Sequence, residues 1–109
     1  MEIAFRTKYL RDLCESEQKA TRFLGQTLAG KLKRRLADLR AAETLADAGS
    51  VVTFREVGRA RPRHMALNLS TGSTMTFRAN HSTVPRLEGG EMDHANVTRI
   101  KILSITNSR

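Results

Sequence analysis

The sequence predicts a single α+β domain, in which an N-terminal strand and helices pack on one face of a mainly antiparallel sheet of four or five strands. Two hydrophobic periods support this class. Apolar residues recur every three or four positions between residues 24 and 39, and every second position in segments after residue 50. The chain has 109 residues, which is enough for one hydrophobic core without disulfides or metals. We therefore expect one domain over residues 1–109.

The first half of the chain is predicted to be mostly helical. Alternating apolar residues predict a short strand over residues 2–5, and a broken apolar pattern predicts one or two short helices over residues 8–24. A leucine stripe then predicts a long helix from about residue 26 to residue 47, with Gly49 after its end. The leucines of the stripe are Leu24, Leu28, Leu32, Leu36 and Leu39.

The second half is predicted to form strands. Residues 51–54 and the pair 64–69 and 74–79 have strand character, and a three-residue loop, 71–73, keeps one face of the predicted hairpin apolar. The cross-strand pairs expected from this register are Leu69 with Met75 and Leu67 with Phe77. The residues expected together on the other face are His64, Ala66, Asn68, Thr74, Thr76 and Arg78.

The last part of the chain combines a long loop with a final strand. Residues 80–96 are polar and contain Pro85, Gly89 and Gly90, and a loop of this length in a small domain is usually functional or mobile. Residues 97–106 are apolar on both faces near their end, which predicts a strand inside the sheet and not at its edge.

Composition narrows the classes of function. The chain has 19 Lys and Arg against 11 Asp and Glu, a formal net charge of +8, and 14 of the cations are Arg. A small Arg-rich domain favours nucleic acid as the partner; a charge that only prevents aggregation, or a basic face that docks an acidic protein, is the alternative. Apolar runs are too short for a membrane span, a signal peptide is not recognisable, and Cys14 is the single cysteine. We therefore expect a cytoplasmic protein.

The candidate RNA-binding residues form a cluster between the predicted strands. They are Arg55, Arg59, Arg61 and Arg63. Cations at the rim of an open sheet face are typical of a groove that follows a phosphodiester backbone, whereas a solvated connector is the alternative. His64 is expected near Arg78 on that face and is a candidate for proton transfer. Cations on the long helix are more typical of a solvated face.

The sequence gives little support for other kinds of functional site. Nucleotide-binding loops and the G-x-S-x-G motif are absent, and aromatic residues make up 5%, too few for a base-stacking platform. The histidines have no metal-ligand spacing, so neither a metal nor another cofactor is expected. Cys14 follows an apolar helix position and is expected in the core.

The order of elements and their residues resemble the RelE/ParE superfamily of bacterial toxins, and most closely its HigB-like branch, the plasmid maintenance killer proteins. The resemblance covers nearly the whole chain. The segments that carry it are residues 2–8 with Leu10, Leu13 and Cys14, the helix from Ala29 to Leu45, the hairpin from Met65 to Phe77 with Gly72, and Pro85, Gly89, Gly90 and Asp93 before the strand from Val97 to Ile105.

The resemblance implies a RelE-like fold and the toxin component of a type II toxin–antitoxin system. It implies a helix-turn-helix, HigA-like antitoxin as partner, and the ribosome with its mRNA as target. The implied activity is metal-free mRNA cleavage, in which a ribose 2′-OH attacks the adjacent phosphate and basic side chains stabilise the charge that develops.

Three positions depart from the family pattern. Thr74 stands at the usual hairpin Arg, Arg55 replaces a His before Glu56, and residues 107–109 replace a terminal Asp-Tyr-His. Arg78 and Arg109 are the cations that offer to replace the lost charges, and with His64 they form the candidate catalytic set. The alternative is a non-catalytic RelE-fold binding module that acts on the ribosome or on gyrase and is neutralised by an antitoxin.

Overall fold

The computed structural model describes residues 1–107, and within them it has four α-helices, a short 3₁₀-helix and five strands. In chain order the elements are β1 (Glu2–Phe5), α1 (Lys8–Glu15), α2 (Glu17–Leu24), α3 (Gln26–Ala41), α4 (Leu45–Ala48), β2 (Arg55–Val57), β3 (His64–Ser70), β4 (Ser73–Ala79), η1 (His94–Asn96) and β5 (Arg99–Asn107). The strands form one mixed sheet in the order β1-β5-β4-β3-β2, where β1 is parallel to β5 and the other neighbours are antiparallel. The predicted α+β class and the internal position of β5 are confirmed.

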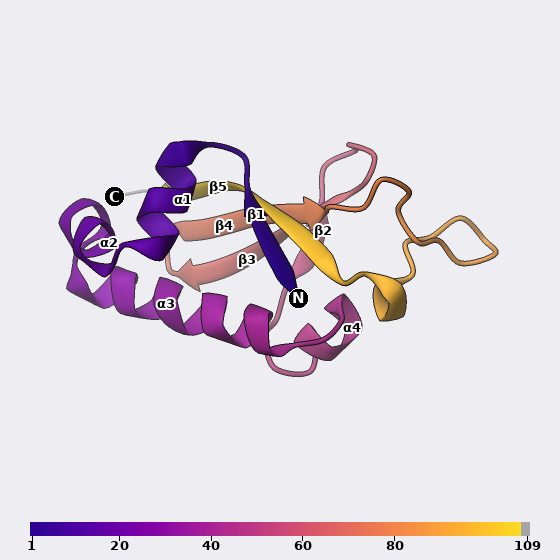
Figure 1. Cartoon of the computed structure of the whole chain (residues 1–109), viewed down its shortest axis with the longest axis horizontal. Helices are drawn as coiled ribbons and strands as arrows, with labels where there is room; N and C mark the ends of the chain where they lie inside the picture. The colour runs from indigo at the N-terminus through magenta and orange to yellow at the C-terminus, as the bar shows by residue number, and fades with distance from the viewer. Residues whose placement is uncertain (108–109) are drawn as a thin grey trace.

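One hydrophobic core joins the helices to the sheet. The long helix α3 runs beside the sheet in Figure 1, and α1 and α2 lie at one end of it. Leucines of α3 and alternate residues of the strands are buried because both patterns direct their apolar side chains to the same layer. The largest fully buried side chains are Leu13, Leu32, Leu36, Leu39, Leu45, Met65, Leu67, Met75, Phe77, Val97, Ile100 and Ile102.

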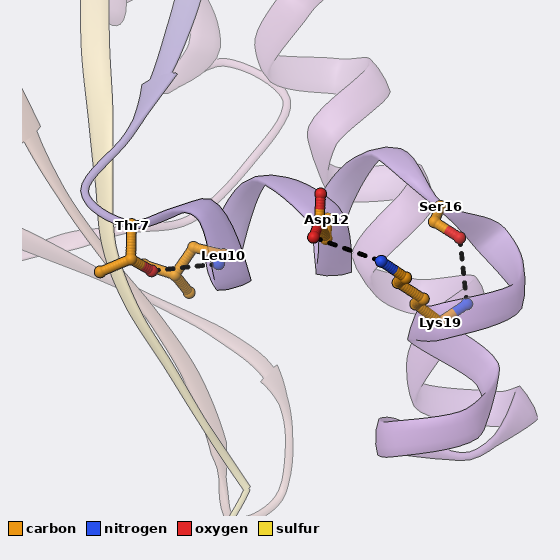
Figure 2. A network of polar contacts seen from close by, with 5 residues as sticks. All are labelled: Thr7, Leu10, Asp12, Ser16 and Lys19. Atoms are coloured by element: carbon orange, nitrogen blue, oxygen red, sulfur yellow. Dashed lines mark hydrogen bonds and ion pairs between the residues drawn. The ribbon is translucent and has the colours of Figure 1, made fainter.

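Residues 8–24 form two helices because Ser16 ends one and begins the next. The backbone N–H of Ser16 donates to the Asp12 carbonyl at the end of α1, and its hydroxyl accepts from the Lys19 backbone N–H in α2, 3.2 Å away. A side-chain ion pair between Lys19 and Asp12, also 3.2 Å long, spans the same junction (Figure 2). Helix α2 then ends at Gly25, whose φ of 85° favours glycine.

The long helix is shorter than its sequence predicts. The expected range was 26–47, but α3 ends before Ala42, whose backbone is extended, and α4 is a separate helix capped by the Thr44 side chain. Leu45 is fully buried, and its N–H donates to the Val97 carbonyl at 2.9 Å. Burial of this leucine against the end of the loop therefore outweighs the helix propensity of the surrounding alanines.

The prediction of a strand over residues 51–54 is wrong. Val51 and Val52 form a turn, in which both backbone N–H groups donate to the Ala48 carbonyl at 3.0 and 2.8 Å. Val52 is nevertheless buried, so its apolar side chain contributes to the core although its backbone belongs to no strand. The strand β2 begins only at Arg55.

The hairpin has the predicted faces but a different register. The observed pairs are Leu67 with Met75 and Met65 with Phe77, two positions from the expected ones. Ser70 and Ser73 flank a two-residue turn that contains Gly72 (φ 83°), and the ladder is irregular between Asn68 and Ser70. Because strand side chains alternate with a period of two, this shift moves no residue to the opposite face.

The segment between β4 and β5 projects beyond the end of the sheet (Figure 1). It contains an antiparallel bridge between Arg86 and Met92, followed by η1. Met92 is buried while Leu87, near the tip, is 51% exposed, so the base of the segment packs on the core and its tip does not. Within the described part of the chain, the structure has no helix of the length and apolar character that crossing a membrane requires.

Replacing Phe77 with Ala should lower the free energy of unfolding by about 3–5 kcal/mol, because the ring is fully buried and leaves a cavity. Leu87→Ala is the control, since a half-exposed side chain at the loop tip should change stability by less than about 0.5 kcal/mol. Urea denaturation followed by circular dichroism measures both values. Similar losses in the two variants would contradict the core described above.

Candidate nucleic-acid interface

The sheet face opposite to the core carries polar and basic side chains, and we call it the open face. In β3, β4 and β5 its residues alternate with buried ones, as Lys101 does between Ile100 and Ile102. The members placed by the strand register are Glu2, Ala4, Arg55, Val57, His64, Ala66, Asn68, Thr74, Thr76, Arg78, Arg99, Lys101, Ser104 and Thr106. The predicted grouping of six hairpin residues on this face is confirmed by their pairing.

Three side chains of the open face form a row across neighbouring strands. His64 on β3 is paired with Arg78 on β4, and Arg78 is paired with Lys101 on β5. All three side chains are partly exposed. The Arg78 guanidinium also donates to the Ala79 carbonyl at 3.0 Å, which holds it along its own strand. The row therefore combines two cations with an imidazole.

The charge of the open face is positive. Within residues 1–107, Glu2 is the one acidic residue that the register places on this face, and it lies 2.9 Å from Arg99 in an ion pair. The row of His64, Arg78 and Lys101 is opposed by no carboxylate from these strands. A surface of this kind attracts polyanions.

Arg55 extends the basic area into the next row. It is paired with Ala66, and its guanidinium donates to the Asn68 side-chain carbonyl at 3.3 Å. The Thr74 hydroxyl donates to the same oxygen at 3.4 Å. Asn68 thus orients Arg55 while leaving the guanidinium exposed to solvent, as the sequence prediction required.

The four arginines of the predicted RNA-binding cluster do not lie together. Arg59 and Arg61 are exposed in the loop between β2 and β3, beyond the end of the sheet ladder. Arg63 instead approaches Glu56, with 3.8 Å between its Nη1 and the carboxylate. Glu56 is paired with the buried Met65, so this ion pair lies on the core side of the sheet. Alternation therefore separates Arg63 from Arg55.

The remaining predicted residues have different surroundings. Arg109 lies outside the described residues. The His81 Nε2 accepts from the Thr98 backbone N–H at 3.0 Å, which ties the long loop to the start of β5. Within residues 1–107, no group of three or more His, Cys, Asp and Glu side chains is arranged to hold a metal ion.

Sequence reasoning missed Lys101. Its signal was present, because Ile-Lys-Ile within the final strand is an alternating pattern that directs the lysine away from the core. The apolar residues that follow obscured it. Leu103 occupies an irregularity in the ladder, where Phe77 pairs with Ile102 and Thr76 with Ser104.

Cys14 lies at a groove between α1, α2 and α3 and is not built as a nucleophile. The groove has a volume of about 820 Å³, and Leu13, Ala29 and Leu32 also line it. Burial raises the pKa of the Cys14 thiol to about 11; Arg40 opposes this shift and Glu15 adds to it. A thiol with that pKa stays protonated near neutral pH and is a poor nucleophile.

Comparison of the chain with protein-family models, curated proteins and solved structures found no match.

Alkylation of Cys14 by iodoacetamide should be slow at neutral pH and should rise with a midpoint near pH 11 in the folded protein. In urea the midpoint should return to the ordinary value for cysteine. Because the pKa of Cys14 is higher in the folded state, this group favours folding at pH values below the ordinary pKa of cysteine. That stabilisation is lost as the pH rises through the folded-state pKa of about 11. Cys14→Ser controls for other reactive groups, and equal midpoints in the folded and unfolded protein would contradict the prediction.

Proposed function

We propose that this chain is a RelE-like toxin of the HigB-like branch, which inhibits translation by cleaving mRNA on the ribosome. The single observation that carries the proposal is the row of His64, Arg78 and Lys101 on a basic open face. The order of strand, helices and antiparallel strands also agrees with the order that the resemblance implies. In this proposal the protein acts in the cytoplasm and is held inactive by a helix-turn-helix antitoxin.

The row has dimensions suited to one phosphodiester group. Adjacent strands lie roughly 4.8 Å apart, so three neighbouring side chains span about 10 Å. Arg78, at the centre, offers a planar fork that binds two phosphate oxygens, and Lys101 supplies a point charge beside it. His64 lies on the other side, within reach of the ribose attached to the same phosphate.

The chemistry proposed for this site is an internal transfer within RNA. The ribose 2′ oxygen forms a bond to the adjacent phosphorus as the bond from phosphorus to the 5′ oxygen breaks. His64 accepts the 2′-OH proton, because imidazole is the side chain that exchanges protons near neutral pH. The 5′ oxygen takes a proton from water or from the same imidazolium. Arg78 and Lys101 stabilise the extra negative charge on the pentavalent phosphorus.

Thr74 favours the second candidate function, a non-catalytic module that binds the ribosome or gyrase. This residue stands where the resembled family has an Arg, and its hydroxyl is engaged with Asn68. A binding module needs the cations of the open face but no proton shuttle. The two functions therefore differ in what they require of His64.

Purified protein added to a translation reaction should cut the message, and primer extension should locate the breaks. His64→Ala should slow cleavage by about 10²-fold, since it removes the proton-transfer group. Arg78→Ala and Lys101→Ala should weaken binding to single-stranded RNA. Each should reduce the slope of log affinity against log salt by about 0.7, the value for one phosphate contact. Lys31→Ala, an exposed change on α3, is the matched control.

The outcomes separate the two candidates. Intact message with a wild-type protein that still binds RNA and stops translation would favour the binding module. RNA affinities that are equal in the Arg78, Lys101 and Lys31 variants would show that the open face is not the interface. A protein that neither binds RNA nor affects translation would overturn the first candidate and the ribosome-binding form of the second, and an unchanged rate of DNA supercoiling by gyrase would overturn the rest.

A further inference from the structure

Glu56 lies between two basic groups that come from distant parts of the chain. One carboxylate oxygen is 3.8 Å from Arg63 Nη1, and the other is 3.6 Å from His94 Nε2. His94 belongs to η1, which is 38 positions beyond Glu56 in the sequence. The carboxylate, which belongs to β2, thus lies near the end of the loop that precedes β3 and near the segment that precedes β5.

The contact with Arg63 lies at the base of the arginine loop, residues 58–63. Val57 and His64 are the last pair of the β2–β3 ladder, and Glu56 and Arg63 flank that pair on the core side. Among residues 1–107, Arg63 Nε is a buried donor without a hydrogen-bond partner, and Glu56 is the acidic side chain within ion-pair distance of this guanidinium. The same ladder pair places His64 on the open face.

His94, the second partner, lies in a segment that packs on the core. The His94 ring lies 6.2 Å from the Phe54 ring, which packs edge to face on the buried Phe77 at 5.8 Å. On its other side η1 contacts α4, and the Val97 carbonyl that follows it accepts from Leu45. Glu56 therefore joins the base of the arginine loop to a well-anchored part of the core.

We infer that Glu56 is a positioning residue that holds the arginine loop at the end of the β2–β3 ladder, so that Arg59 and Arg61 reach the same bound RNA as His64 and Arg78. The RNA part of this inference rests on the proposed function; the positioning part does not. The expected effect of Glu56 on RNA affinity is opposite to the effect of its charge alone. Removing a negative charge normally strengthens RNA binding, whereas removing this one should weaken it, because the loop loses its anchor.

The test compares Glu56→Gln with Glu88→Gln, which removes the same charge from an exposed position in the loop between β4 and β5. A fluorescein-labelled single-stranded RNA is titrated with each protein, and amide hydrogen exchange is measured without RNA over residues 55–65 and 92–98. We expect Glu56→Gln to bind the RNA about fivefold more weakly than wild type. Exchange should be faster in both segments, while Glu88→Gln should match or exceed the wild-type affinity.

A charge exchange distinguishes positioning from a general loss of structure. Both partners are about two-fifths exposed, so the melting temperature of Glu56→Gln should fall by less than about 4 °C. The double variant Glu56→Arg with Arg63→Glu restores the pair at unchanged net charge and should recover affinity to within about twofold of wild type. A role of Arg63 as a direct phosphate ligand would not be rescued in this way.

Each outcome decides the inference. Glu56→Gln that binds RNA as tightly as wild type, with unchanged exchange in both segments, overturns it. Failure of the double variant to restore slow exchange over residues 55–65 also overturns it, because the exchanged pair should hold the loop even without the contact to His94. Wild-type protein that does not bind the RNA refutes the proposed function instead, and the exchange data then decide whether Glu56 holds the loop.

Discussion

The burial of one sheet face beneath α3 is the constraint on which the rest of the structure depends. Leucines of α3 and alternate residues of β3, β4 and β5 fill a single apolar layer. Every residue that lies between two buried ones along a strand is thereby directed to the opposite face. The basic row is a consequence of this packing, because His64, Arg78 and Lys101 are each adjacent in sequence to a residue that is buried in the core.

The same alternation divides a cluster that looks continuous in the sequence. Arg55 and Glu56 are neighbours, yet one faces solvent on the open face and the other meets Arg63 on the core side. Arg59 and Arg61 lie in the loop that joins the two strands and belong to neither face. The net charge of +8 is therefore distributed over several surfaces, and only part of it is available to one bound polyanion.

Acidic residues form ion pairs with several of these cations. On α3, Arg35 is paired with Asp38, and Lys33 is paired with Glu17 of α2. These pairs are exposed or partly exposed and contribute little stability individually. Glu56 differs because its two partners come from separate loops, so its effect is on the placement of chain segments.

The sequence by itself determined the α+β class and the two hairpin faces, because each depends on local period. It left open one or two short helices over residues 8–24, and the Ser16 junction makes them two. Only the tertiary structure decided the end of α3, the hairpin register and the joining of Glu56 to His94. Those features depend on contacts between residues far apart in the chain. The chain leaves α3 at Ala42 so that Leu45, at the start of α4, is buried near Val97, and no local pattern encodes that break.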